Sequence, residues 1–132
     1  MEVKDIKPTT EAVFRVIRTD GVEETVKFTV SFIGPQMIPD YVWRTEIDKV
    51  RLSKMVQEAL VDAVLGWDLT MDGKPLLCTE ENKRKFFPGI LGLKLWKEKK
   101  AEGEKDEATQ LDEYLGWALI NFAGDQENFL KN

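Results

Sequence analysis

Four residues near the middle of the chain have the types and spacing of the first ligands of a calcium-binding loop. Asp68, Thr70, Asp72 and Gly73 match positions 1, 3, 5 and 6 of that loop, with the glycine where its sharp turn belongs. The match fails at position 12, where the loop needs a bidentate glutamate and this chain has Thr79. Because a calcium site loses most of its affinity without that glutamate, we interpret the segment as a capped turn. We expect neither a metal nor another cofactor.

Two residue counts exclude several kinds of catalytic site. The chain has no histidine, which excludes histidine-based triads, His-Glu-x-x-His zinc sites and histidine general bases. Its single cysteine, Cys78, cannot form an internal disulfide and lacks the histidine that usually activates a thiol nucleophile. We expect Cys78 to be a small, partly buried packing residue.

The acidic residues do not form an evident acid–base pair. Such a pair needs one carboxyl group in an apolar pocket, but Glu80 and Glu81 begin an expected helix, and the other candidates lie in the charged run 102–107. No Walker loop, nucleophile elbow or dinucleotide-binding glycine pattern is present. We therefore expect a protein that is not an enzyme.

Length and charge limit the class of protein further. The 132 residues, of which 42% are hydrophobic, suit a single domain with one core. A net charge of -5 argues against nucleic acid as a partner, because phosphate binding needs a basic face. No apolar run is long enough to cross a bilayer, and the charged start at residues 1–5 lacks the apolar segment of a signal peptide. We expect a cytoplasmic protein that binds neither nucleic acid nor membranes.

The first quarter of the chain predicts a loose arm at 1–10 and an antiparallel β-hairpin at 11–33. Residues 12–18 are β-branched and aromatic, residues 19–21 form a turn signal, and residues 25–33 alternate between apolar and polar side chains. One face of the hairpin has to be buried, so we expect an odd-length turn with a bulge at Gly21. That turn would pair two residues of each strand: Phe14 with Phe28, and Val16 with Val26. Val30 and Phe32 would share the buried face.

The rest of the chain, 40–132, predicts a mainly helical body. A capping box at Thr45 precedes an apolar helical stripe, and we expect this helix to stop at Gly66. The stripe consists of Leu52, Met55, Val56, Ala59, Leu60, Ala63 and Val64. After the turn at 72–75, Thr79 caps a short helix that ends or bends near Pro88.

Two more helices are expected towards the C-terminus. One runs from residue 90 to 100, and the other covers residues 111–123 and ends at Gly124, with a charged loop near 97–109 between them. The predicted fold is therefore a single α+β domain, with an N-terminal antiparallel β-hairpin followed by a mainly helical body of about four helices.

Aromatic side chains are the best candidates for contacts with a partner protein, because Trp and Phe are common in contact surfaces. The chain has four tryptophans, and an entirely buried set would be unusual in so small a protein. Trp96 and Phe129 lie beside charged sequence without evident structure. The predicted contact residues are Trp96, Phe129, Leu130, Trp67 and Phe86. Ordinary packing is the alternative for each.

A series of short motifs in the chain matches a known family. Val64 is followed by Trp67–Asp68, by the turn Asp72–Leu76, by the helix start Thr79–Asn82, and by a C-terminal Lys131–Asn132. This series resembles the tail assembly chaperones of long-tailed, siphovirus-type bacteriophages. Members of that family often combine Val-x-x-Trp-(Asp/Glu), Asp-Gly-x-Pro-Leu and Thr/Ser-x-Glu-Asn with a terminal Lys-Asn. The predicted N-terminal hairpin also fits the family's usual opening.

The resemblance implies a non-enzymatic protein that binds the tape-measure protein, a long helical chain with much apolar surface. It implies that the protein keeps this client soluble and promotes assembly of the tail-tube protein around it. The expected partners also include further copies of the chain, as a homo-oligomer, and a longer frameshift form of the same protein. A phage or prophage protein of this kind works in the host cytoplasm and is absent from the mature virion.

General physical arguments agree with this resemblance and leave two other classes open. A chaperone needs apolar patches together with charge for solubility, and the unpaired edge of a hairpin is a route to self-association by strand addition. One alternative is a structural phage tail or connector subunit, which would stay in the virion. The other is a small regulatory protein that binds a host protein and would be monomeric.

Overall fold

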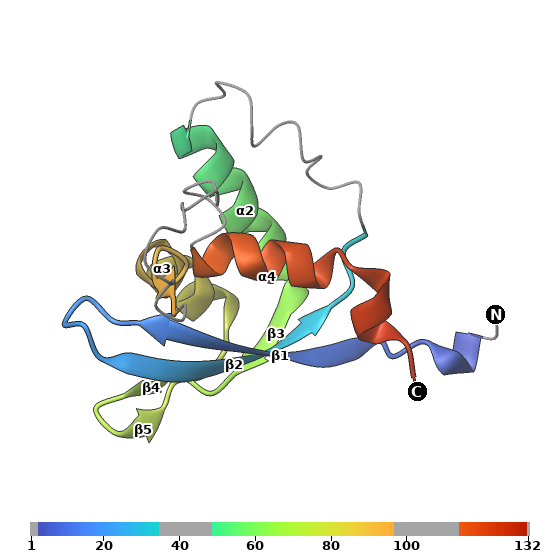
Figure 1. Ribbon diagram of the computed structural model, residues 1–132, viewed down its shortest axis with the longest axis horizontal. Helices are drawn as coiled ribbons and strands as arrows, with labels where there is room; N and C mark the ends of the chain where they lie inside the picture. The colour runs from blue at the N-terminus through green and yellow to red at the C-terminus, as the bar shows by residue number, and fades with distance from the viewer. Residues whose placement is uncertain (1–2, 35–48, 97–113, 132) are drawn as a thin grey trace, which may run out of the picture.

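The computed structural model describes residues 3–34, 49–96 and 114–131 (Figure 1). Within these ranges, three α-helices lie on one side of a four-stranded antiparallel sheet. The predicted α+β class agrees with this arrangement, but a hairpin followed by about four helices is wrong. Two segments that we expected to be helical are strands of the sheet.

The N-terminal hairpin consists of β1 (Thr9–Ile17) and β2 (Glu23–Ser31). The Arg18 N–H donates to the Val22 carbonyl (2.8 Å) and the Gly21 N–H to the Arg18 carbonyl (2.9 Å). Gly21 has φ +85°, as expected for a three-residue loop that ends in a left-handed residue. The expected odd-length turn is therefore confirmed, and Gly21 has the left-handed conformation that such a turn needs.

The strand register differs from the expected one by two residues. Phe14 pairs with Val26, and Ala12 pairs with Phe28. Since a shift of two residues keeps every side chain on its face, the buried face is still the expected one. Val26, Phe28 and Val30 are buried, whereas Phe32 is 40% exposed because β2 ends before it.

Strands β3 (Val64–Trp67) and β6 (Lys94–Leu95) complete the sheet in the order β3-β2-β1-β6. β3 pairs with β2 through Phe28–Trp67 and Val30–Val64, with an irregularity between them. β6 pairs with the last two residues of β1. Both neighbours of the hairpin therefore come from the expected helical body, and β3 pairs with the part of the β2 edge from Phe28 to Val30.

Each misassigned strand replaces part of an expected helix. Gly66 does not end a helix: α2 (Lys49–Ala63) ends three residues earlier, and Gly66 lies in β3 with a backbone that packs close to Thr29. The helix expected at 90–100 is absent from its described part: α3 ends at Ile90, Leu91 is its C-cap, and the strand β6 begins at Lys94.

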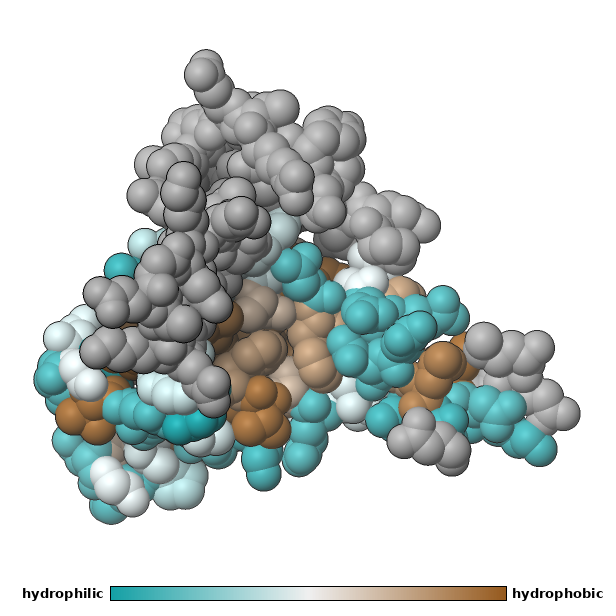
Figure 2. Space-filling view, viewed as in Figure 1, coloured by the Kyte–Doolittle hydropathy of each residue, from teal (hydrophilic) through white to brown (hydrophobic). Residues whose placement is uncertain are grey.

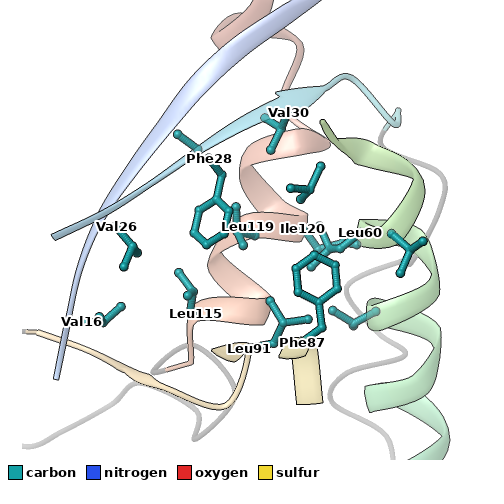
Figure 3. Close-up of a cluster of buried hydrophobic side chains, with 14 of the residues drawn as sticks. Val16, Val26, Phe28, Val30, Leu60, Phe87, Leu91, Leu115, Leu119 and Ile120 are labelled. Atoms are coloured by element: carbon teal, nitrogen blue, oxygen red, sulfur yellow. The ribbon is translucent and has the colours of Figure 1, made fainter. Parts of the chain in front are cut away.

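The core lies between the sheet and the helices (Figure 3). Phe28 and Val30 of the sheet face Leu119 and Ile120 of α4 (Leu115–Ala123), and Leu60 of α2 packs beside them. The N-terminus of α4 has no side-chain cap; instead the Gly116 N–H donates to the Leu91 carbonyl (3.0 Å). A Cβ at residue 116 would lie 3.1 Å from the Leu91 Cβ, so glycine permits this close approach.

The turn and the cap predicted between residues 72 and 79 are confirmed. β4 (Thr70–Met71) and β5 (Lys74–Pro75) form a small hairpin whose turn residues, Asp72 and Gly73, both have positive φ. The Thr79 hydroxyl then accepts the Asn82 N–H (3.1 Å) and begins α3 (Glu80–Ile90). The helix continues through Pro88 for two residues beyond the expected stop.

The two ends of the described chain are joined to each other. Residues 3–5 form the short 3-10 helix η1 (Val3–Asp5), and the C-terminal segment contains a second, η3 (Gln126–Phe129). The Lys7 N–H donates to the Phe129 carbonyl (2.7 Å), and Ile6 bridges Leu130. The expected loose arm therefore holds the C-terminal segment in place, and β1 already begins at Thr9.

Lys83 is the one charged residue that is buried among the described residues, at 8% exposure. Its Nζ donates to the carbonyls of Val61 (2.6 Å) and Val64 (2.9 Å). These carbonyls lie at the C-terminal end of α2 and the start of β3, where helical donors run out and a positive charge is favourable. Lys83 therefore attaches α3 to the junction between α2 and β3.

We expect Lys83→Met to lower the free energy of unfolding by about 2 kcal/mol, because two buried carbonyls would lose their donor. Denaturant unfolding followed by circular dichroism measures this change. Lys85→Met, on the exposed side of the same helix, is the control and should unfold near the wild-type midpoint. Equal midpoints for both variants would contradict the role given to Lys83.

Candidate functional site

The best candidate for a contact surface is the face of the sheet opposite the helices. Figure 1 shows α2, α3 and α4 on one side of the sheet only. On the other side, β1 presents Val13, Arg15 and Ile17, and Trp96 follows β6 next to them. We call these four residues the outer-face patch. Val13 is 52% exposed, so β1 presents an apolar side chain on this face.

Trp96 is held in place by Arg15. The Trp96 N–H donates to the Arg15 carbonyl (2.9 Å), which extends the pairing of β6 with β1 by one residue. The Arg15 guanidinium carbon lies 4.0 Å from the centroid of the Trp96 ring, and the same side chain forms an ion pair with Glu23. The ring is therefore oriented along the sheet and stays half-buried.

The other predicted contact residues lie elsewhere. Phe129 is 1% exposed and packs against Phe32 and Phe122, so it belongs to the core and the packing alternative holds for it. Leu130 is half-buried in its bridge to Ile6. Trp96 lies opposite Arg15 near the C-terminal end of β1, whereas Leu130 bridges Ile6 before that strand begins. The structure therefore does not bring Trp96 and Phe129 into one site.

Trp67 and Phe86 have different environments. Trp67 is half-buried on the inner face, where its Nε1 donates to the Leu76 carbonyl (2.7 Å) and its ring meets Phe87 edge-on. This tryptophan supports the fold. Phe86 is half-buried on α3 and is not among the residues packed against the main core, with the Lys85 Nζ 5.4 Å from its ring centroid. Trp43 lies outside the described residues.

Val13 is the contact candidate that sequence reasoning missed. Its signal was present: residues 12–17 place apolar side chains on both faces of β1, whereas β2 alternates. A strand that is apolar on both faces is usually covered on both.

Figure 2 shows a second apolar area over α4, a helix without any charged residue.

The residues of the calcium-loop template have structural roles instead. The Asp68 carboxylate accepts the Lys27 N–H (3.0 Å), and Asp72 belongs to the β4–β5 turn. Among the described residues, no three His, Cys, Asp or Glu side chains come together as a metal site. Cys78 is half-buried as expected, and burial raises the pKa of its thiol.

Comparisons of the chain with protein-family models, with curated proteins and with solved structures find no significant match in any of the three. In the part of the chain that the structure describes, no helix combines the length and the apolar character needed to cross a membrane.

The hairpin tip carries the most strongly shifted carboxyl group of the described residues. Hydrogen bonds from the Arg18 guanidinium (3.2 Å from its Nε) and from the Val22 N–H (3.1 Å) hold the pKa of Asp20 at about 2, below its ordinary value of 3.8. A carboxyl group whose pKa is lower in the folded than in the unfolded chain stabilises the fold at pH values above its unfolded pKa. This stabilisation is lost as the pH falls from about 4 towards about 2.

We expect an NMR titration of the Asp20 carboxyl carbon to give a midpoint near 2 in the wild type. In Arg18→Gln the midpoint should rise towards 3.8, because the main cause of the shift is gone. A wild-type midpoint near 3.8, or no rise in the variant, would show that the Arg18–Asp20 pair does not form in solution.

Proposed function

We propose that this protein is a tail assembly chaperone of a long-tailed bacteriophage, without enzymatic activity. It binds the tape-measure protein, keeps that chain soluble, and promotes assembly of the tail-tube protein around it. The proposal combines the motif resemblance between Val64 and Asn82 with the presence of an apolar surface that the described helices leave uncovered.

The single observation that supports the proposal best is the outer-face patch. A client with exposed apolar helices needs a surface that offers apolar contact area without causing aggregation. Val13, Ile17 and the Trp96 ring supply the apolar area, while Arg15 and its partner Glu23 supply charge beside it. Arg15 also orients the ring before the client arrives, which lowers the entropic cost of binding.

The proposed place of action is the host cytoplasm before the tail is complete, and the protein is absent from the finished virion. Further copies of the chain and a longer frameshift form of it belong to the same proposed assembly. Mass spectrometry of purified particles separates this role from that of a structural tail or connector subunit, which would be found in the virion.

The direct test is co-expression with the protein of the neighbouring long helical open reading frame. A chaperone should increase the soluble fraction of that protein and co-purify with it. If the client stays insoluble and this protein is recovered alone as a monomer, the chaperone proposal fails and a small regulatory protein becomes the better explanation.

We expect Val13→Lys and Trp96→Ala each to reduce the amount of co-purified client about tenfold, because each removes a central apolar contact. The amount is measured by quantitative mass spectrometry of the affinity-purified complex. Met55→Lys is the matched control, since Met55 is 42% exposed on α2, on the helical side of the sheet. Equal losses in all three variants, or none in the first two, would contradict the assignment of the patch.

A further inference from the structure

Two lysines flank the outer-face patch. In an antiparallel pair of strands, directly opposite residues point to the same face of the sheet. Lys27 of β2 lies opposite Val13, and Lys94 of β6 lies opposite Ile17, so each apolar residue of the patch on β1 has a lysine as its cross-strand neighbour. Because β1 lies between β2 and β6, the two lysines approach the patch from opposite sides.

Neither lysine is neutralised within the part of the chain that the structure describes. Both side chains are exposed, and no carboxylate there lies within ion-pair distance of either ammonium group. Asp68 contacts Lys27 through the backbone, since its carboxylate accepts the Lys27 N–H (3.0 Å). The two ammonium groups are therefore available to a partner.

The outer face of β1, β2 and β6 carries more positive than negative charge. Its cations are Arg15, Lys27 and Lys94, and its carboxylates are Glu11 and Glu23. Glu23 is already paired with Arg15, which leaves two lysines against one carboxylate. This local balance is opposite in sign to the net charge of -5 of the whole chain.

The geometry of a sheet face favours a helix as the partner. A segment that lies across the face of a sheet cannot bond to the backbone of the strands, so it has to satisfy its own backbone groups. An α-helix does this, and the opposite face of the same sheet is covered by helices (Figure 1). A helix along β1 would place its apolar stripe over Val13 and Ile17, and its two flanks near Lys27 and Lys94. Carboxylates on those flanks would complement the lysines.

The same face is poorly suited to a nucleic acid. Phosphate binding needs a face without competing carboxylates, whereas Glu11 and Glu23 share this one. Val13 and Ile17 are aliphatic, so they offer a base neither hydrogen bonds nor aromatic stacking. The combination of aliphatic side chains with flanking lysines therefore favours a protein segment.

We propose that the outer-face patch binds an acidic amphipathic helix. The apolar stripe of that helix lies along β1, with one carboxylate towards Lys27 and another, on the opposite flank, towards Lys94. This inference rests on the proposed function, because it takes the patch as the client site and identifies the client segment by its charge. Within a long helical client, the bound segments are those that carry acidic residues beside the apolar stripe.

The test is isothermal titration calorimetry of the purified full-length chain with synthetic amphipathic peptides of about 18 residues, or five helical turns. Two peptides share a leucine stripe and differ only in glutamate or lysine on the flanks. The Glu-flanked peptide should bind more tightly, although the net charge of -5 by itself attracts the Lys-flanked one. A third peptide, with Glu flanks and serine in place of leucine, should not bind, because the apolar contact is missing.

Charge reversal at the two lysines tests their role directly. Lys27→Glu and Lys94→Glu should each weaken binding of the Glu-flanked peptide about fivefold, the scale of one exposed ion pair. The double variant should prefer the Lys-flanked peptide. Lys85→Glu is the matched control, since it makes the same change on α3, on the helical side of the sheet, and should alter the affinity less than about twofold in physiological salt. All three lysines are exposed, and thermal unfolding checks that each variant is folded.

Several results would overturn the assignment of an acidic helix. These are a wild type that prefers the Lys-flanked peptide or binds neither, an equal loss in Lys85→Glu, and tighter binding of oligothymidine than of the Glu-flanked peptide. If the client is rescued on co-expression while the wild type prefers the Lys-flanked peptide, the chaperone proposal stands and the acidic helix is wrong. If the client is not rescued while the preference for the Glu-flanked peptide holds, only the chaperone proposal fails.

Discussion

The direct passage from α2 into β3 is the constraint on which much of this structure depends. Ala63 ends the helix and Val64 begins the strand, so no loop residue can bond the last helical carbonyls. The Lys83 ammonium supplies the missing donors to both elements and is buried while doing so. This attachment fixes α3, and with it Phe87 beneath Trp67 and Ile90 at the end of the sheet. One buried cation thus links the helical layer to the sheet.

The placement of all three described helices on one side of the sheet has a consequence for the other side. β2 is suited to this arrangement, since Thr25, Lys27 and Thr29 point away from the core. β1 is not, since Val13 and Ile17 are apolar on the face that the helices leave open. Within the part of the chain that the structure describes, Val13 stays 52% exposed and Ile17 is half-buried, so covering them would still release free energy, which is the usual physical basis of a contact surface.

The sequence could predict the parts of the fold that depend on local chemistry. The alternation in β2, the positive φ at Gly21, the β4–β5 turn and the Thr79 cap are all determined within a few residues. β3 and β6 could not be predicted in this way, because they are two to four residues long and exist only through pairing with distant strands. The same limit applies to Phe129, whose burial depends on a bridge to the other end of the chain. The sequence predicts Trp96 as a contact residue. It does not predict the outer-face patch, because Trp96 joins the other residues of that patch only through the pairing of β6 with β1.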